Sequence, residues 1–289
     1  MVTKLLRSTY FYFFAISCAA LSSCSIFDTK EQIPSYIHID KITFVPGSDT
    51  SYIGEGTTST KITDAWVYVD EQLVGTYELP ATFPVQYSGV HSVRVLGGIK
   101  QNGISATRVK YPFYNSNLYS VDLTPKQTST ISPSVSYFSG ITFNMIEDFE
   151  FSSYVLTDTM GDARLRVVTG TQAWGGGKSI YAQLAGDTIT LQARSSNTYS
   201  LYNDGHAKFL ELNYRCNHPF VFGLIYAGGT YPIVGLNASP NWNKVYLNLT
   251  DQITSSIPSN YGFYFAMQKL LTDQVVPEIY LDNIKLIHN

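Results

Sequence analysis

The sequence predicts an all-β fold with two successive β-sandwiches. Past residue 35, apolar residues recur at every second position, as in 65–69 and 210–214, and Gly, Pro, Asn, Asp and Ser separate these segments. One stretch, 259–271, is passable as a helix, but its alternating, aromatic-rich Tyr261-Gly262-Phe263-Tyr264-Phe265 favours a strand. A stretch rich in Pro, Ser and Thr at 124–134 marks the approach to a boundary, which gives blocks 35–140 and 146–289.

The composition excludes two broad classes of protein. Only 14% of the 289 residues are charged, against a usual ~25%, but the mean hydropathy is −0.02 because Tyr, Ser, Thr and Asn fill the deficit. A polytopic membrane bundle is therefore excluded. The net charge of −3 leaves no surplus of positive charge for a phosphate backbone, so we expect no nucleic-acid partner.

The N-terminus has the pattern of an export signal. Lys4 and Arg7 precede an apolar run at 10–16 and then small residues. The run is shorter than the ~20 residues that a membrane-spanning helix needs. We therefore predict that residues 1–23 form a signal peptide and that the polar residues 24–34 form a tether.

The end of this signal resembles the lipobox of bacterial (Bacteroidetes-type) lipoproteins, through Leu21-Ser22-Ser23-Cys24. The resemblance implies cleavage before Cys24 and acylation of that residue with chains such as palmitate, which would anchor the protein in the bilayer. The implied location is the cell envelope, at the outer membrane, with the face of that membrane open. The alternative is an ordinary secretory signal that contains a Cys.

The cysteine count agrees with a lipoprotein. Cys18 would leave with the signal and Cys24 would carry lipid, so Cys216 would be alone in the mature chain and no disulfide could form within it. Cys216 alternates with apolar residues, and we expect it to be buried as a small hydrophobic residue.

The first block, 35–140, contains a hairpin motif. The segment 65–75 places the turn Asp70-Glu71 between two strands, and Gly89-Val90-His91 opens a later strand. This run resembles PEGA-like and carboxypeptidase-regulatory-like modules of Ig type, except at Glu71, where such modules usually have Gly. The resemblance implies an Ig-like sandwich that serves as a noncatalytic spacer or interaction unit.

The second block, 146–289, carries three motifs in order. They are Glu147-Asp148-Phe149-Glu150, the Gly-Lys-Ser strand at 177–182, and Tyr280-Leu281-Asp282-Asn283-Ile284 in the last strand. Together they resemble carbohydrate-binding modules and the wider galactose-binding-like superfamily. The resemblance implies a jelly-roll sandwich and a noncatalytic binding role.

The same resemblance implies a structural Ca²⁺ where the first and last strands are neighbours. The ion would be held by Glu150 and Asp282, with Asp148 nearby and backbone carbonyls of Gly177 or Lys178, which are the oxygen ligands that Ca²⁺ prefers. The alternative is a carboxylate bonded to backbone N–H groups or paired with Lys178.

Strand alternation makes two further predictions about these acidic residues. It places Asp148 and Glu150 on one face, opposite Phe149 and Phe151. It also places Asp282 on the apolar face of Ile284 and Leu286.

Aromatic side chains are the candidates for a glycan platform. Trp174 lies beside the triple glycine 175–177, and Trp242 leads into an apolar strand, where a Trp more often packs in a core. Tyr226 is a further candidate. We therefore take Trp174, Trp242 and Tyr226 as possible ligand-binding residues.

Other chemistries lack their motifs. A P-loop needs Gly where this chain has Gln172, so we expect no nucleotide. The five His show no metal-ligand spacing and there is no nucleophile elbow, so we expect no enzyme. Asp158-Thr159-Met160 and Asp187-Thr188-Ile189 resemble short bacterial O-glycosylation sites, which makes Thr159 and Thr188 possible acceptors.

Two functions follow from these patterns. The first is a membrane-anchored, noncatalytic lipoprotein that binds a glycan at the cell envelope. The alternative is an accessory or structural subunit of an outer-membrane or surface protein complex, which would bind protein and not sugar.

Overall fold

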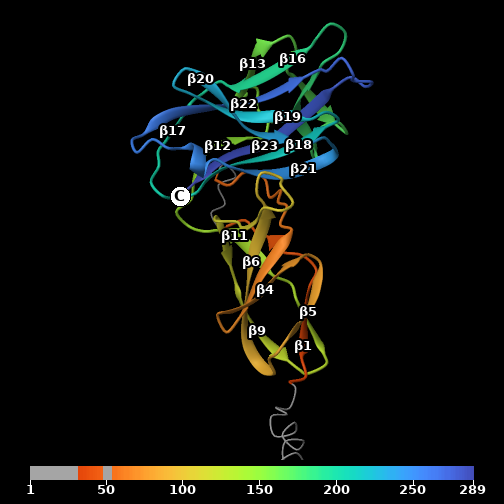
Figure 1. Ribbon diagram of the computed structural model, residues 1–289, viewed down its shortest axis with the longest axis vertical. Coiled ribbons are helices and arrows are strands. Elements are labelled where there is room, and N and C mark those ends of the chain that lie inside the picture. Colours follow the sequence, from red (N-terminus) through yellow and green to blue (C-terminus); the bar gives the residue numbers. More distant parts are fainter. Residues whose placement is uncertain (1–31, 48–53) are drawn as a thin grey trace, which may run out of the picture.

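The computed structural model describes residues 32–47 and 54–289, which form two sandwiches, with one end of the N-terminal sandwich against a sheet of the C-terminal sandwich (Figure 1). Cys24, the signal peptide and the tether as far as residue 31 lie outside the described residues, so their roles stay predictions. Nearly every regular element is a strand, which confirms the all-β prediction, and the predicted strand near 259–271 is present as β22 (Ser259–Gln268). In the described part of the chain no helix is long and apolar enough to span a membrane.

The N-terminal sandwich contains three small sheets, with strand orders β10-β1-β5, β2-β11-β8 and β4-β3-β6-β7, where β9 also pairs with β6. Its alternating positions, among them Ile37, Val67 and Val95, form one buried core. The strands are β1 (Ser35–Ile39), β2 (Thr43–Phe44), β3 (Asp64–Val69), β4 (Gln72–Glu78), β5 (Ala81–Val85), β6 (Gly89–Lys100), β7 (Arg108–Lys110), β8 (Tyr114–Ser116), β9 (Leu118–Leu123), β10 (Thr128–Ile131) and β11 (Ser134–Tyr137).

The β3–β4 turn shows how the chain does without the expected glycine. Asp70 and Glu71 both have positive φ, at 48° and 63°, as in the two-residue type I′ turn that suits a twisted hairpin. The Asp70 carboxylate accepts bonds from the Ser92 backbone N–H, at 3.0 Å, and lies 2.7 Å from His91 Nδ1. These bonds hold the turn in a conformation that non-glycine residues rarely adopt.

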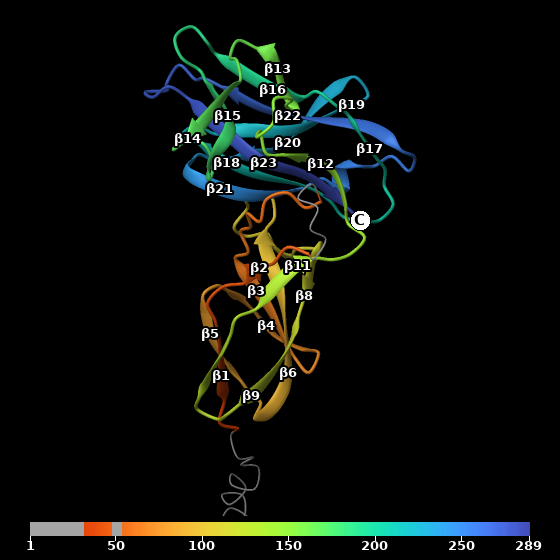
Figure 2. The same ribbon diagram turned by 180° about the vertical axis from the view of Figure 1, so that it is seen from behind.

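The C-terminal sandwich is a jelly-roll-type pair of six-stranded sheets (Figure 2). The proximal sheet, β14-β15-β23-β18-β21 with β12, lies next to the N-terminal sandwich, and the distal sheet is β13-β16-β22-β19-β20 with β17. The remaining bounds are β12 (Thr142–Glu147), β13 (Leu156–Gly161), β14 (Arg166–Gly170), β15 (Gly176–Gln183), β16 (Thr190–Ser195), β17 (Tyr199–Leu201), β18 (Lys208–Cys216), β19 (Phe220–Tyr226), β20 (Gly229–Leu236), β21 (Ser239–Asn248), the 3₁₀ turn η2 (Thr250–Gln252) and β23 (Glu278–His288).

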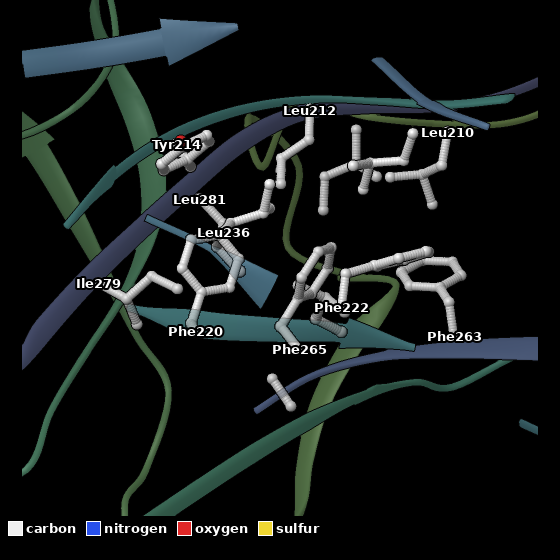
Figure 3. Close-up of a cluster of buried hydrophobic side chains, with 14 of the residues drawn as sticks. Leu210, Leu212, Tyr214, Phe220, Phe222, Leu236, Phe263, Phe265, Ile279 and Leu281 are labelled. Atoms are coloured by element: carbon white, nitrogen blue, oxygen red, sulfur yellow. The ribbon is translucent and has the colours of Figure 1, made fainter. Parts of the chain in front are cut away.

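The core of this sandwich lies between the two sheets (Figure 3). Phe222 and Phe265 of the distal sheet pack with their ring centroids 5.5 Å apart, and Leu212 and Leu281 come from the proximal sheet. Cys216 is 2% exposed and free, which confirms its predicted burial. Alternate residues of the proximal strands therefore point away from this core, onto an outer face that must find other partners.

One end of that outer face is covered by the N-terminal sandwich. Phe209, Tyr246 and Ile287 belong to the core of the N-terminal sandwich, although they lie on strands of the proximal sheet. Among them the fully buried Glu211 pairs with Lys244, at 2.7 Å between Oε2 and Nζ. The two sandwiches thus share apolar contacts, and their junction encloses a buried ion pair of the C-terminal sandwich.

Tyrosines of the first sandwich complete the bonding of Glu211. The hydroxyls of Tyr111 and Tyr137 donate to Glu211 Oε1 at 2.7 and 2.8 Å. Burial alone would raise the pKa of Glu211, but the ammonium groups of Lys244 and Lys285 hold that pKa below its ordinary value. The carboxylate therefore stays ionised inside the junction.

Candidate functional site

A pocket opens on the outer face of the proximal sheet because one edge of β23 is shared by two strands. β12 pairs along the second half of this edge as far as Glu147 opposite Ile284, and β15 pairs along the first half as far as Ile180 opposite Leu281. The two residues between these registers, Asp282 and Asn283, pair with neither strand. The chain leaving β12 and the chain entering β15 both turn beside this gap.

At this gap, the side chains of β23 do not alternate between the two faces of the sheet as the sequence predicted. Leu281, Ile284 and Leu286 all point into the core, so Asp282 does not share the face of Ile284 and Leu286, and that prediction was wrong. The cause is a bulge, in which Asn283 has φ = 49° and inserts one residue into the alternation. The bulge leaves Asp282 beside the pocket.

The predicted alternation at Asp148 and Glu150 was also wrong. β12 ends at Glu147, so these residues lie in a turn. Phe149 is fully buried whereas Phe151 is 70% exposed, so the two do not share a face. Both acidic residues nevertheless line the pocket, because the turn follows the gap along β23.

Glu150 is fastened to the Gly-Lys-Ser segment. Its Oε1 accepts the Lys178 backbone N–H at 2.7 Å, while Lys178 Nζ donates to the Glu150 carbonyl at 2.6 Å. A Cβ on Gly177 would lie 2.1 Å from Glu150 Oε1, so glycine is required for this approach. These bonds match the alternative considered for the acidic motif, a carboxylate bonded to backbone N–H groups.

Asp282 is held by two donors, and its charge is disfavoured. Ser179 Oγ donates to Asp282 Oδ2, and the Asn283 backbone N–H donates to Oδ1 at 2.6 Å. Burial, aided by the charges of Asp148 and Glu150, outweighs these bonds and raises the pKa of Asp282 to about 7. The pocket therefore contains a carboxyl group that titrates near neutral pH.

Trp174 and Asn283 complete the pocket. The Trp174 backbone N–H donates to Ser179 Oγ at 2.9 Å, which ties the Trp174 loop to Asp282 through the serine hydroxyl. The Trp174 side chain is half-buried, and the side chain of Asn283 is 4% exposed, with no partner for Nδ2 among the described residues. Residues of the N-terminal sandwich, including Glu55 and Thr57, form the opposite wall of this cavity of about 640 Å³.

The predicted calcium donors converge on this pocket without forming a compact cluster. Asp148, Glu150, Gly177 and Asp282 all line it, and Lys178 borders it through Glu150. In residues 32–47 and 54–289, no three His, Cys, Asp or Glu side chains are grouped closely enough to hold a metal ion. Glu150 and Asp282 are instead bonded to protein donors, so calcium binding stays a prediction.

The other predicted residues lie elsewhere. Trp242 is half-buried on the outer face of the proximal sheet, where its ring lies 5.6 Å from the Arg215 guanidinium, so the expectation that it packs in the core was wrong. Tyr226 stacks on Tyr231 near the β19–β20 turn, with centroids 4.1 Å apart.

Thr188, a predicted glycosylation site, is partly exposed between β15 and β16, and the side chain of Thr159 lies outside the described residues. Glycosylation of either threonine stays a prediction.

Sequence reasoning missed three contributors to the pocket. Ser179 and Asn283 stood inside motifs that had been identified, but only the strand pairing shows that they meet. Glu55 belongs to the other sandwich, and no signal in the sequence connects it to a site about 230 residues further along the chain.

Comparisons with known proteins are distant. No protein-family model and no curated protein matches the chain. Among solved structures, it is similar to the CBM22-1-GH10 modules of Clostridium thermocellum xylanase 10B complexed with xylohexaose, at 10% identity over 50% of this chain and 28% of that one, with a TM-score of 0.37. An exo-beta-agarase matches at 11% identity, over 50% and 25% of the two chains, with a TM-score of 0.34.

A carbohydrate-binding module of family 29 is also similar, at 10% identity over 51% of this chain and 88% of that one, with a TM-score of 0.33. The chain spans only about a quarter of the length of the xylanase and agarase structures.

Proposed function

We propose that this protein is a noncatalytic glycan-binding module, and that the pocket at the Asp282–Asn283 gap holds a sugar residue. The observation that carries the proposal is the meeting in one cavity between the sandwiches of Trp174, four carboxyl groups and the Asn283 amide, whose Nδ2 has no partner among the described residues. The cavity lies within the size range of small-molecule sites.

The chemistry of these groups suits a pyranose. The apolar face of a sugar ring packs on an aromatic side chain such as Trp174. Hydroxyl groups donate to the carboxylates of Asp148 and Glu150, and a hydroxyl oxygen accepts the N–H that Asn283 Nδ2 leaves without a partner. A sugar thus satisfies donors and acceptors of the pocket at once.

The same proposal places the module at the cell envelope through a lipid anchor on Cys24. This part is supported by the sequence alone, through the lipobox resemblance at 21–24. Replacement of Cys24 by Ser should release the protein from the membrane fraction at high salt. Retention of the Cys24→Ser protein in that fraction would contradict the anchor.

Binding to a glycan array is the direct test of the pocket. The wild-type chain should bind a defined set of glycans, and Trp174→Ala should weaken that binding about tenfold, because an aromatic contact contributes about 0.5–1.5 kcal/mol in addition to the apolar area that it buries. Tyr202→Ala, which removes an aromatic side chain that is 41% exposed, is the matched control. Equal binding by both variants would show that Trp174 does not contact the glycan. Absence of binding by the wild-type chain would refute the proposed glycan-binding function.

A protein-binding role is the second candidate, favoured by a groove on the distal sheet. This groove of about 570 Å³ is lined largely by apolar groups, including Met160, Val221 and Ala266, and Met160 is 50% exposed. Cross-linking in native membranes should then give one stoichiometric partner, and Met160→Lys should abolish the product. Glycan binding without any such product would exclude this alternative.

A further inference from the structure

A row of arginine and aromatic side chains crosses the outer face of the proximal sheet beside the pocket. Arg166, Tyr181, Tyr280 and Arg215 are direct cross-strand partners on β14, β15, β23 and β18, in that order. Trp242 of β21 closes the row. We call these five residues the arginine–aromatic row.

The guanidinium groups lie over the rings of the row. Arg215 Cζ is 4.0 Å from the centroid of Tyr280, and Arg166 Cζ is 4.9 Å from that of Tyr181. The two tyrosine rings are tilted against each other with centroids 4.5 Å apart. Both tyrosines are less than a tenth exposed, so their ring faces are not free to stack on a sugar.

Both guanidinium groups lack a carboxylate partner among the described residues. Arg215 donates to the Gln172 carbonyl, at 3.2 Å, and Arg166 contacts the Tyr181 ring. By contrast, Arg94 and Arg108 of the N-terminal sandwich are each paired with carboxylates. Arg166 is exposed and Arg215 partly so, and bidentate donors of this kind fit a carboxylate or sulfate group.

The centre of the row has the opposite requirement. The Tyr181 hydroxyl donates to Gln183 Oε1 at 2.6 Å, and the hydroxyls of Tyr181 and Tyr280 lie 3.3 and 3.5 Å from Glu278 Oε2. The Glu278 carboxylate has only acceptor oxygens. A ligand that spans the row must therefore carry anionic groups at its two ends and hydroxyl groups between them.

The need for hydroxyl groups at Glu278 separates two kinds of polyanion. Three strand intervals separate Arg166 from Arg215, so their backbones lie about 14 Å apart. Duplex nucleic acid carries a phosphate of each strand about every 3.4 Å of helix axis, which would place phosphates against Glu278. An acidic polysaccharide carries hydroxyl groups beside its charged groups and can turn those hydroxyls toward Glu278, so it fits the row.

We propose that the arginine–aromatic row binds the anionic groups of an acidic polysaccharide, carboxylated or sulfated, whose chain continues into the pocket. The row and the pocket are contiguous, because Tyr280 and Tyr181 lie two residues from Asp282 and Ser179 on the same strands. The proposal rests on the glycan-binding function proposed above and narrows it to a class of glycan.

The test compares matched pairs of polysaccharides with the full chain. Polygalacturonate and its methyl-esterified form differ only in free carboxylates, and dextran sulfate and dextran differ only in sulfate. An array should hold both pairs with other uronate polymers and their esterified forms. At least one acidic member should bind at least about tenfold more tightly than its neutral counterpart, since a hydrogen bond to a charged group has about that value.

Variants connect this preference to the row. Arg166→Gln combined with Arg215→Gln should remove the preference, whereas Arg94→Gln, which removes one positive charge from the N-terminal sandwich, should not. Each single variant, Arg166→Gln or Arg215→Gln, makes the same change of charge as Arg94→Gln and should weaken the preference. The melting temperature of each variant confirms that it is folded. A preference for uronates or for sulfated dextran identifies which anionic group the row accepts.

Three outcomes would overturn the inference. Equal binding of the acidic and neutral polysaccharides, or a preference for the acidic one that survives the double substitution, would refute the proposed role of the row. The proposed sugar site in the pocket would still stand if binding depended on Trp174. Absence of binding to every glycan, acidic or neutral, would refute both the row and the proposed function.

Discussion

Charged side chains lie at both ends of the outer face of the proximal sheet, but they are buried and paired at one end and uncovered at the other. At the junction end, Glu211, Lys244 and Lys285 are all less than a tenth exposed. Glu211 pairs with Lys244 of the same sheet and accepts from tyrosines of the N-terminal sandwich, and Lys285 donates to the Thr57 carbonyl of that sandwich. At the free end, Arg166 and Arg215 lie over aromatic rings without a carboxylate partner among the described residues. The strands β18 and β23 run through both ends.

The difference shows that the role of a charged side chain depends on whether the N-terminal sandwich covers it, and not on which strand it belongs to. A charge that is buried must be paired, and it then specifies how the two sandwiches fit. A charge on an uncovered part of the same sheet is available for a ligand. The pocket lies between these extremes, with Asp282 buried but surrounded by further carboxylates.

The largest effect is expected at the junction. Glu211→Gln removes the charge that faces Lys244 and weakens the acceptor for Tyr111 and Tyr137. We expect the free energy of unfolding to fall by about 3–5 kcal/mol, as when one partner of a buried pair is removed. Urea denaturation provides the measurement. A loss below about 1 kcal/mol would mean that the junction end is as well solvated as the free end.

Calcium addition tests whether a cation can compensate the carboxylates of the pocket, as the lysines compensate Glu211 at the junction end. If Ca²⁺ binds Glu150 and Asp282, calcium at a hundredfold excess over its Kd should add about 2.7 kcal/mol to the free energy of unfolding at pH 8. Melting in chelator-treated buffer, before and after calcium addition and with magnesium as control, measures this. If neither EDTA nor calcium changed the melting temperature, the predicted calcium site would be contradicted.

The pH dependence of stability tests Asp282 directly. Because its pKa is about 7 in the folded protein and near 3.8 when unfolded, the folded state binds the proton more tightly. This contribution to stability is complete below about pH 4 and is lost as the pH rises through 7. In metal-free buffer, the free energy of unfolding should fall by up to about 1.4 kcal/mol per pH unit within that window.

The Asp282→Asn variant isolates this contribution, because it keeps acceptor and size but cannot ionise. Its stability should change less between pH 5 and 7 than that of the wild-type chain. Identical pH profiles for the two proteins would show that Asp282 is not the group responsible.

The smallest effect is expected where a carboxylate is exposed. Glu71 pairs with Arg94 at 2.7 Å, but 61% of its side chain is exposed and its φ is +63°. Glu71→Gly loses an exposed ion pair and relieves an unfavourable backbone conformation, effects of about 1 kcal/mol or less and of opposite sign. Urea denaturation should show a net change within about 1 kcal/mol. A loss as large as that for Glu211→Gln would contradict the comparison of buried and exposed charges.

Much of the architecture could be predicted from the sequence, because period-two alternation is a local signal. It identified the all-β class, the strand around Phe263 and the burial of Cys216. The resemblance to carbohydrate-binding modules, and not alternation, pointed to Glu150 and Asp282, and the search for an exposed aromatic platform pointed to Trp174. These three residues meet in one pocket.

The errors arose where alternation is interrupted. The bulge at Asn283 turned Asp282 away from the face of Ile284, and the end of β12 at Glu147 removed the alternation assumed for Asp148. Such interruptions depend on which strands pair along an edge, which involves residues a hundred positions apart. The arginine–aromatic row was missed for the same reason, since Arg166 and Arg215 become neighbours of Tyr181 and Tyr280 only through cross-strand register.

The sequence by itself therefore determined the strands and the alternation of their faces, because each follows from the chemistry of adjacent residues. Only the tertiary structure decided which outer face would be covered, where β23 would be left unpaired, and that Glu55 of one sandwich would form a wall of a pocket in the other. The physical reason is that alternation gives every strand two faces, whereas long-range packing determines what each face meets.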